Sequence, residues 1–209
     1  NMPQPSVILE GLGAIANRCA ALAIVWHVVL AVLFIVFLAG WRPSRKLGAI
    51  LLTLPLWSVA VLAFAYHNPF NGIIFLVFAV VLAAIGVRLP AENAKSAGGW
   101  ALGAGIILIL FGFFYPHFLS EYAWTRYLFA APTGLIPCPT LSVILGFALV
   151  TKGFGSRAYA LCLVALGFFF GLFGALRLGV GIDTVLILGA ITLLLQTVFV
   201  GRGSAGRAD

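Results

Sequence analysis

The sequence predicts an all-α, polytopic membrane protein with seven transmembrane helices, and three observations support this fold class. The 209-residue chain is 63% hydrophobic and 8% charged, with a mean hydropathy of +1.18, which is too apolar for a water-soluble domain. Apolar runs of about 20 residues, the length that crosses a bilayer as a helix, recur along it. Lys and Arg outnumber Asp and Glu by 12 to 5, and most of them lie in short connections, as in cytoplasmic loops.

Seven apolar runs define the expected spans. They lie near 18–40, 47–66, 71–88, 98–115, 134–151, 158–176 and 183–200. Residues 1–17 are expected to form an interfacial segment, because Glu10 and two glycines interrupt the apolar pattern. Residues 201–209 are expected to form a cytoplasmic tail, so that 1–209 is a single transmembrane domain. In a six-helix alternative, the fifth run is only re-entrant.

The basic residues orient this arrangement. The connections after the first, third, fifth and seventh runs are basic, whereas the opposite side holds only Arg18, Arg126 and Arg177. The positive-inside rule then places the N-terminus outside and the C-terminus in the cytoplasm. The basic residues of the cytoplasmic side are Arg42, Arg45, Lys46, Arg88, Lys95, Lys152, Arg157, Arg202 and Arg207.

The outer ends of the runs carry a greater variety of polar side chains than the cytoplasmic ends. Each has an ordinary structural explanation: Asn71 caps a helix after the "YHNPFN" turn, and Asp183 caps the last helix with Arg177 as its ion-pair partner. Taken together, however, they predict a polar pocket at the outer face. The candidate binding residues are His67, Asn71, Tyr115, His117, Cys138, Thr140 and Asp183, with His27 as a deeper polar group.

Three prolines surround Cys138 in the stretch "PTGLIPCPT". Pro132, Pro137 and Pro139 cannot all belong to a regular helix, because each removes an N–H and clashes with the preceding turn. Irregular backbone at membrane depth requires a covering of protein or a wet cavity. The stretch is therefore expected to be irregular, with Thr140 near the first turn of the helix that follows. A rigid plug and a polar site at Cys138 are both compatible with this pattern.

His27 lies about nine residues into the first run. An intramembrane histidine indicates a pathway, a haem ligand or an interhelical hydrogen bond, and a hydrogen bond to Ser58 or Thr53 is the preferred interpretation. A haem with two histidine ligands needs a second histidine at similar depth. His67 and His117 are expected nearer the surface, so haem is not expected.

Small and aromatic residues predict how the helices pack. Gly99 and Gly103 in the fourth run, and Gly167, Gly171 and Gly174 in the sixth, are expected to let neighbouring helices approach closely. A phenylalanine cluster that includes Phe173 is interpreted as lipid-facing or as core filler.

Several of these motifs resemble those of an uncharacterised family of bacterial multi-pass membrane proteins with a Pro-Cys-Pro-Thr signature. The resemblance covers about residues 66–195. It rests on "YH" followed by Asn71, "YP" at 115–116, "APTGLIPCPT" with the following "LGFALV", and "GVGID" at 179–183. It implies a bacterial inner (cytoplasmic) membrane location and groups His67, Asn71, Tyr115, Cys138 and Asp183 at the outer face. The family has no established activity, so the resemblance implies no reaction.

Three classes of function remain open. The first is an outer-face pocket that binds or passes a small solute or ion. The second is a metal-binding or redox protein, in which His67, His117 and Cys138 hold copper or zinc. The third is an accessory subunit or assembly factor of a larger membrane complex, or a homo-oligomer. An enzyme is disfavoured because no hydrolase or phosphate-binding motif occurs. Membrane lipids are expected partners, and nucleic acid is not.

Overall fold

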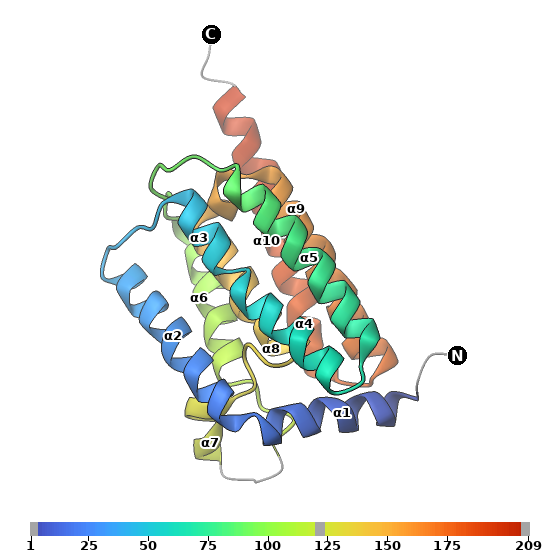
Figure 1. The fold of residues 1–209 in the computed structure, drawn as a ribbon. Coiled ribbons are helices and arrows are strands. Elements are labelled where there is room, and N and C mark those ends of the chain that lie inside the picture. Colours follow the sequence, from blue (N-terminus) through green and yellow to red (C-terminus); the bar gives the residue numbers. More distant parts are fainter. Residues whose placement is uncertain (1–3, 120–123, 206–209) are drawn as a thin grey trace.

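The computed structural model describes residues 4–119 and 124–205, and the regular elements within these ranges are helices (Figure 1). The α-helices are α1 (Pro5–Arg18), α2 (Ala20–Leu38), α3 (Arg45–Leu51), α4 (Leu54–Ala65), α5 (Pro69–Val87), α6 (Gly99–Phe113), α7 (Trp124–Ala130), α8 (Pro137–Val150), α9 (Arg157–Leu172) and α10 (Thr184–Ala205). Three short helical turns join them: η1 (Lys152–Gly155), the π-helical turn η2 (Phe173–Arg177) and η3 (Gly181–Asp183).

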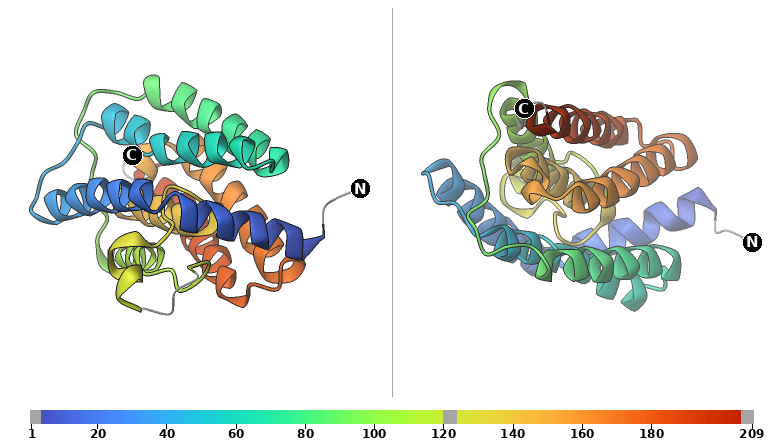
Figure 2. Two further views of the ribbon diagram at one scale, coloured as in Figure 1. Left: turned by 60° about the horizontal axis from the view of Figure 1, so that its bottom comes forward. Right: turned by 90° about the horizontal axis from the view of Figure 1, so that it is seen from above.

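Most of the chain forms one bundle. Seven segments run in alternating directions between its two ends: α2, α3 with α4, α5, α6, α8, α9 and α10 (Figure 1). Helix α1 lies across one end of the bundle, and the C-terminal end of α10 lies at the other (Figures 1 and 2). Helix α10 continues through residues 201–205, so part of the expected tail is helical, and residues 206–209 lie outside the described residues.

Five segments in the described part of the chain are long and apolar enough to cross a membrane, against the seven expected. Helices α6 and α8 are apolar but have only 15 and 14 residues. Proline limits α8, because the chain does not become helical until Pro137, and Pro116 follows soon after the end of α6. The five long segments are Ala20–Leu38, Arg45–Ala65, Pro69–Val87, Arg157–Arg177 and Gly181–Phe199.

The local sequence explains where several helices begin. Asn68 accepts a hydrogen bond from the backbone N–H of Asn71 (3.2 Å) at the start of α5. Ser44 and Ser156 cap α3 and α9 in the same way. In α5, Pro69 also occupies the first turn. Backbone N–H groups in the first turn have no partner within the helix, so the N–H that proline lacks costs no helical hydrogen bond. Asn71 is therefore not the cap that the sequence suggests, since Asn68 performs that role.

Helix α8 forms the centre of the bundle. All 14 of its residues are buried, and it packs on α6, α9 and α10. The crossing with α6 is close because two glycines meet: a Cβ at Gly146 would lie 2.6 Å from the carbonyl oxygen of Gly105. The close approach expected at Gly99 and Gly103 is wrong, because both face open space. Gly171 does touch α10, where its Cβ would lie 3.0 Å from the backbone nitrogen of Ile187.

The basic connections gather at the end of the bundle opposite α1. The Arg45 guanidinium donates to the carbonyl oxygen of Gly155 (2.9 Å) and lies 3.8 Å from the carboxylate of Glu92. The backbone N–H of Ala94 donates to the carbonyl of Pro43 (2.8 Å). Hydrogen bonds therefore join three of the connections that the sequence marks as basic.

Helix α1 covers the end of the bundle near Cys138. Its buried face, formed by Leu12, Ile15 and Ala16, includes residues that pack against Leu135 and Ile136 just before α8. Its other face exposes charged side chains, including Glu10 and Arg18. This two-sided pattern is typical of a helix that lies in a membrane interface.

Candidate functional site

The candidate site is centred on the carboxylate of Asp183, which is only 1% exposed. The Tyr115 hydroxyl donates to Oδ1 of Asp183 (2.5 Å), and the Cys138 thiol donates to Oδ2 (3.0 Å). Tyr115 follows α6, Cys138 lies in the first turn of α8, and Asp183 ends η3. Three segments that are distant in sequence thus converge on one buried carboxylate.

A glycine makes room for this carboxylate. A Cβ at position 174 would overlap the Asp183 carboxylate, so residue 174 must be glycine for Asp183 to occupy its position. Asp183 therefore does not cap α10 or pair with Arg177 as the sequence suggests. Its carboxylate points into the bundle because Tyr115 and Cys138 supply hydrogen-bond donors there.

Both donors to the carboxylate are neutral. Tyr115 is fully buried, and its phenol donates as a neutral hydroxyl. Within the described part of the chain, no Lys or Arg forms an ion pair with Asp183. Intramembrane carboxyl groups that lack a direct cationic partner are costly, which makes them candidates for function.

A small pocket adjoins the thiol. It has a volume of about 10 Å³, and its lining includes Cys138, Asn71, Leu12, Phe173 and Gly174. Oδ1 of Asn71 has no hydrogen-bond partner, although the residue is only 2% exposed. A cavity of roughly this size holds one water molecule. The pocket therefore has room for one water beside Asn71 and Cys138, and its lining is mostly apolar.

Thr140 has a structural role next to the site. Its hydroxyl donates to the carbonyl of Ile136 (2.6 Å) and accepts from the backbone N–H of Gly134 (2.8 Å). It lies in the first turn of α8, as the sequence predicts, and the preceding stretch is irregular and buried. The Trp26 ring lies against Gly134, where a Cβ would clash with it, and Gly134 has a positive φ of 80°.

His67 lies in a separate, larger groove. The residue is exposed in the turn between α4 and α5, with a φ of 56°. The groove has a volume of about 1050 Å³ and lies between α1 and this turn. Its lining includes Glu10, Arg18, Tyr66, His67, Asn68, Phe70 and Phe173.

His27 also lies away from the carboxylate. Its ring Nε2 is 3.0 Å from the carbonyl oxygen of Phe113, and its Nδ1 is buried without a hydrogen-bond partner. The expected bond to Ser58 or Thr53 is wrong. Ser58 accepts from the indole of Trp26 (3.0 Å), and Thr53 donates to the carbonyl of Ile50 (2.8 Å).

The structure does not assemble the metal site that His67, His117 and Cys138 would form. No three His, Cys, Asp or Glu side chains come together in residues 4–119 and 124–205 to hold a metal ion. Cys138 points inward to Asp183, His67 is in the exposed turn, and His117 packs on Phe118 at a ring distance of 4.3 Å. Copper or zinc binding by these three residues therefore finds no support in the geometry.

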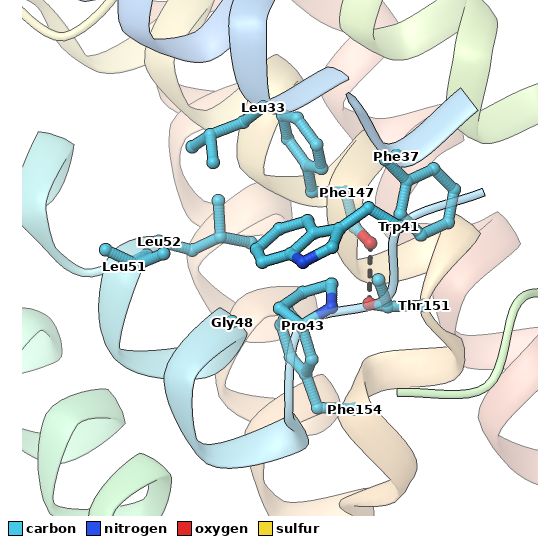
Figure 3. Close-up of a pocket in the computed structure, with 10 residues that line it drawn as sticks. All are labelled: Leu33, Phe37, Trp41, Pro43, Gly48, Leu51, Leu52, Phe147, Thr151 and Phe154. Atoms are coloured by element: carbon cyan, nitrogen blue, oxygen red, sulfur yellow. Dashed lines mark hydrogen bonds between the residues drawn. The ribbon is translucent and has the colours of Figure 1, made fainter. Parts of the chain in front are cut away.

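A further pocket of about 30 Å³ lies at the basic end of the bundle (Figure 3). Aromatic and aliphatic side chains form most of its lining, including Trp41, Phe147 and Phe154. The Thr151 hydroxyl already donates to the carbonyl of Phe147 (2.7 Å). This pocket is a gap in apolar packing, without the convergent polar groups that mark a binding site.

The fold and site together define a class: an all-helical chain whose apolar helices fit a multi-pass membrane protein, with a hydrogen-bonded carboxylate buried near one end. Searches of protein-family models, curated proteins and solved structures find no match to this chain. Its function is therefore argued from the geometry of the site.

The roles of two residues at the site could not be predicted from the sequence. Gly174 is recognisable as a small residue for close packing, but its contact is a carboxylate from the next turn rather than a helix backbone. Phe173 lines both the groove and the small pocket. From the sequence, the phenylalanine cluster that includes it is expected only to face lipid or to fill the core. The pairing of Tyr115 with Asp183 spans 68 residues, and no local pattern encodes it.

Proposed function

We propose that this protein is a seven-span protein of the bacterial inner membrane, with its N-terminus outside and its C-terminus in the cytoplasm. The alternating directions of the seven segments and the clustering of basic connections at one end support this topology. In this arrangement the short helix α8 crosses the membrane together with the irregular segment 131–136, which protein covers on all sides. The Asp183 site then lies near the outer face.

We further propose that the protein binds protons at this face and passes them into the bundle. The observation that carries this proposal is the hydrogen-bonded group of Asp183, Tyr115 and Cys138 beside a pocket of one-water size. The pocket is too small for a solute larger than water. Of the ligands open on sequence grounds, a proton carried by water fits best.

The environment of Asp183 suits reversible protonation. Burial disfavours the charged form of a carboxyl group, whereas hydrogen bonds donated to it favour that form. Asp183 experiences both effects, since it is buried and accepts bonds from Tyr115 and Cys138. The unpaired Oδ1 of Asn71 offers an acceptor for a water in the pocket. This water would connect Cys138, and through it Asp183, to a source of protons.

Buried polar groups continue from this site toward the basic end. Ser142 donates to the carbonyl of Leu108 (2.7 Å), and Gln196 donates to that of Leu149 (3.0 Å) with its own Oε1 unpaired. Both lie on the central helices α8 and α10. They are buried polar groups that a proton path toward the basic end could use.

Proteoliposomes that enclose a pH-sensitive dye test this function. After a step to lower external pH, vesicles with the native protein should acidify faster than empty vesicles. Asp183→Asn should return the rate to that of empty vesicles, because it removes the proton acceptor. Glu92→Gln is the matched control, since this carboxylate is exposed at the opposite end of the bundle. Equal rates with native protein and without protein would contradict the proposal.

A further inference from the structure

The groove beside α1 and the small pocket at Cys138 are neighbours. His67 and Phe70 line the groove, and Asn71, one residue further along the chain, lines the pocket. On α1, Gly11 lines the groove and Leu12 lines the pocket. The same two stretches of chain therefore line both spaces.

Phe173 is the residue that the two linings share. Its ring lies 5.5 Å from that of Phe70 and stacks on that of Phe169 at 6.0 Å. This aromatic group stands where the large groove meets the small pocket. Removal of the Phe173 ring would join the two spaces, whereas removal of the Phe169 ring would not, since Phe169 lines neither space.

We infer that the groove is the route by which water and protons reach Asp183, and that the Phe173 ring is the barrier that excludes larger solutes from the site. The assignment of the groove as a route for protons rests on the proposed proton-binding function. Its geometry depends only on the groove, the pocket and the ring between them.

The backbone at Phe173 suits a movable barrier. Phe173 begins the π-helical turn that ends α9, and its carbonyl accepts from the N–H of Leu178 (3.1 Å), five residues later. Single π-helical turns of this kind occur frequently at functional sites. A small shift of this turn would displace the ring and open the pocket to the groove.

Chemical labelling of Cys138 tests the barrier directly. Cys19→Ser and Cys162→Ser leave Cys138 as the single thiol, and 2-aminoethyl methanethiosulfonate is the probe, with its attachment followed by intact-mass spectrometry. The native side chain at 173 should allow only slow labelling. Phe173→Ala should raise the rate about tenfold or more, because a cavity replaces the ring. Phe173→Trp should lower the rate.

Two further variants keep the test decisive. Phe169→Ala removes an exposed ring of the same cluster and should leave the rate within about twofold. Phe173→Leu keeps an apolar side chain if alanine destabilises the fold, and it should raise the rate to an intermediate value. The inference would be overturned if Phe169→Ala and Phe173→Ala accelerated labelling equally. It would also be overturned if neither Phe173→Ala nor Phe173→Leu accelerated labelling. Labelling does not require proton transport, so either proposal can fail without the other.

Discussion

At the scale of single residues, the position of the Asp183 carboxylate depends on what surrounds it. Gly174 leaves the space, and Tyr115 and Cys138 supply the donors. The local sequence around Asp183 instead favours a helix cap, which needs no distant partner. Tertiary contacts decide between these two roles, because a donor on each carboxylate oxygen offsets the cost of burying the charge.

Gly174→Ala should destabilise the protein by about 2 kcal/mol or more, because the new Cβ would overlap the carboxylate and force it from its donors. Thermal unfolding in detergent measures the loss. Gly103→Ala is the matched control: Gly103 faces open space within α6, so alanine should be neutral or slightly stabilising. Equal losses in the two variants would contradict the contact at Gly174.

Tyr115→Phe should shift the protonation of Asp183 to higher pH. The hydroxyl donates to the carboxylate and so favours its charged form, and its removal makes protonation easier. A pH titration followed by infrared spectroscopy measures the midpoint. Tyr159→Phe, which removes a buried hydroxyl bonded to Ala49 instead, should leave the midpoint unchanged. A shift to lower pH in Tyr115→Phe would contradict the assigned hydrogen bond.

At the scale of elements, the segment before α8 is the most predictable feature. Three prolines exclude a regular helix, and membrane depth requires that protein cover the irregular backbone. The structure agrees in part: residues 131–136 are non-helical and buried, and Thr140 satisfies two of their backbone groups. Pro137 and Pro139 instead belong to the first turn of α8, where a missing N–H breaks no helical hydrogen bond. Glycine spacing was less informative, because Gly99 and Gly103 lie on an exposed face while Gly105 meets α8. A glycine pattern predicts a helix–helix contact only when it is known which face of the helix points into the bundle.

Thr140→Val should destabilise the fold by about 1–3 kcal/mol, since it leaves the buried N–H of Gly134 without an acceptor. Chemical denaturation in detergent provides the measurement. Thr192 is a suitable control because its hydroxyl also donates to the carbonyl four residues earlier, but near the surface of α10. Thr192→Val should change stability by no more than about 0.5 kcal/mol. If Thr140→Val were equally mild, the segment before α8 would not depend on this bond.

At the scale of the whole molecule, charge and composition predict more than any motif. The apolar runs predict the helical segments, although two helices are shorter than a bilayer requires because prolines and irregular backbone interrupt them. The basic connections are joined at one end of the bundle, as their spacing suggests. The long-range pairing of Tyr115, Cys138 and Asp183 could not be predicted, since it depends on how α6, α8 and the α9–α10 turn pack.

The proposed orientation predicts which end of the bundle is accessible from outside the cell. In a background without native cysteines, His67→Cys should react with a membrane-impermeant maleimide added to intact cells. Glu92→Cys should react only after permeabilisation, because the basic end faces the cytoplasm. Both positions are exposed in the structure, so burial does not explain a difference. The opposite labelling pattern would contradict the orientation and place the Asp183 site on the cytoplasmic side.

The measurement that tests the central claim most directly is pH-difference infrared spectroscopy of the purified protein, native beside Asp183→Asn. A reversible carbonyl band of a protonated carboxyl group should appear as the pH falls, shift in heavy water, and vanish in Asp183→Asn while it persists in Glu92→Gln. Such a band would assign reversible protonation to Asp183. Its absence from the native protein, or its survival in Asp183→Asn, would contradict the account of Asp183 as a proton site.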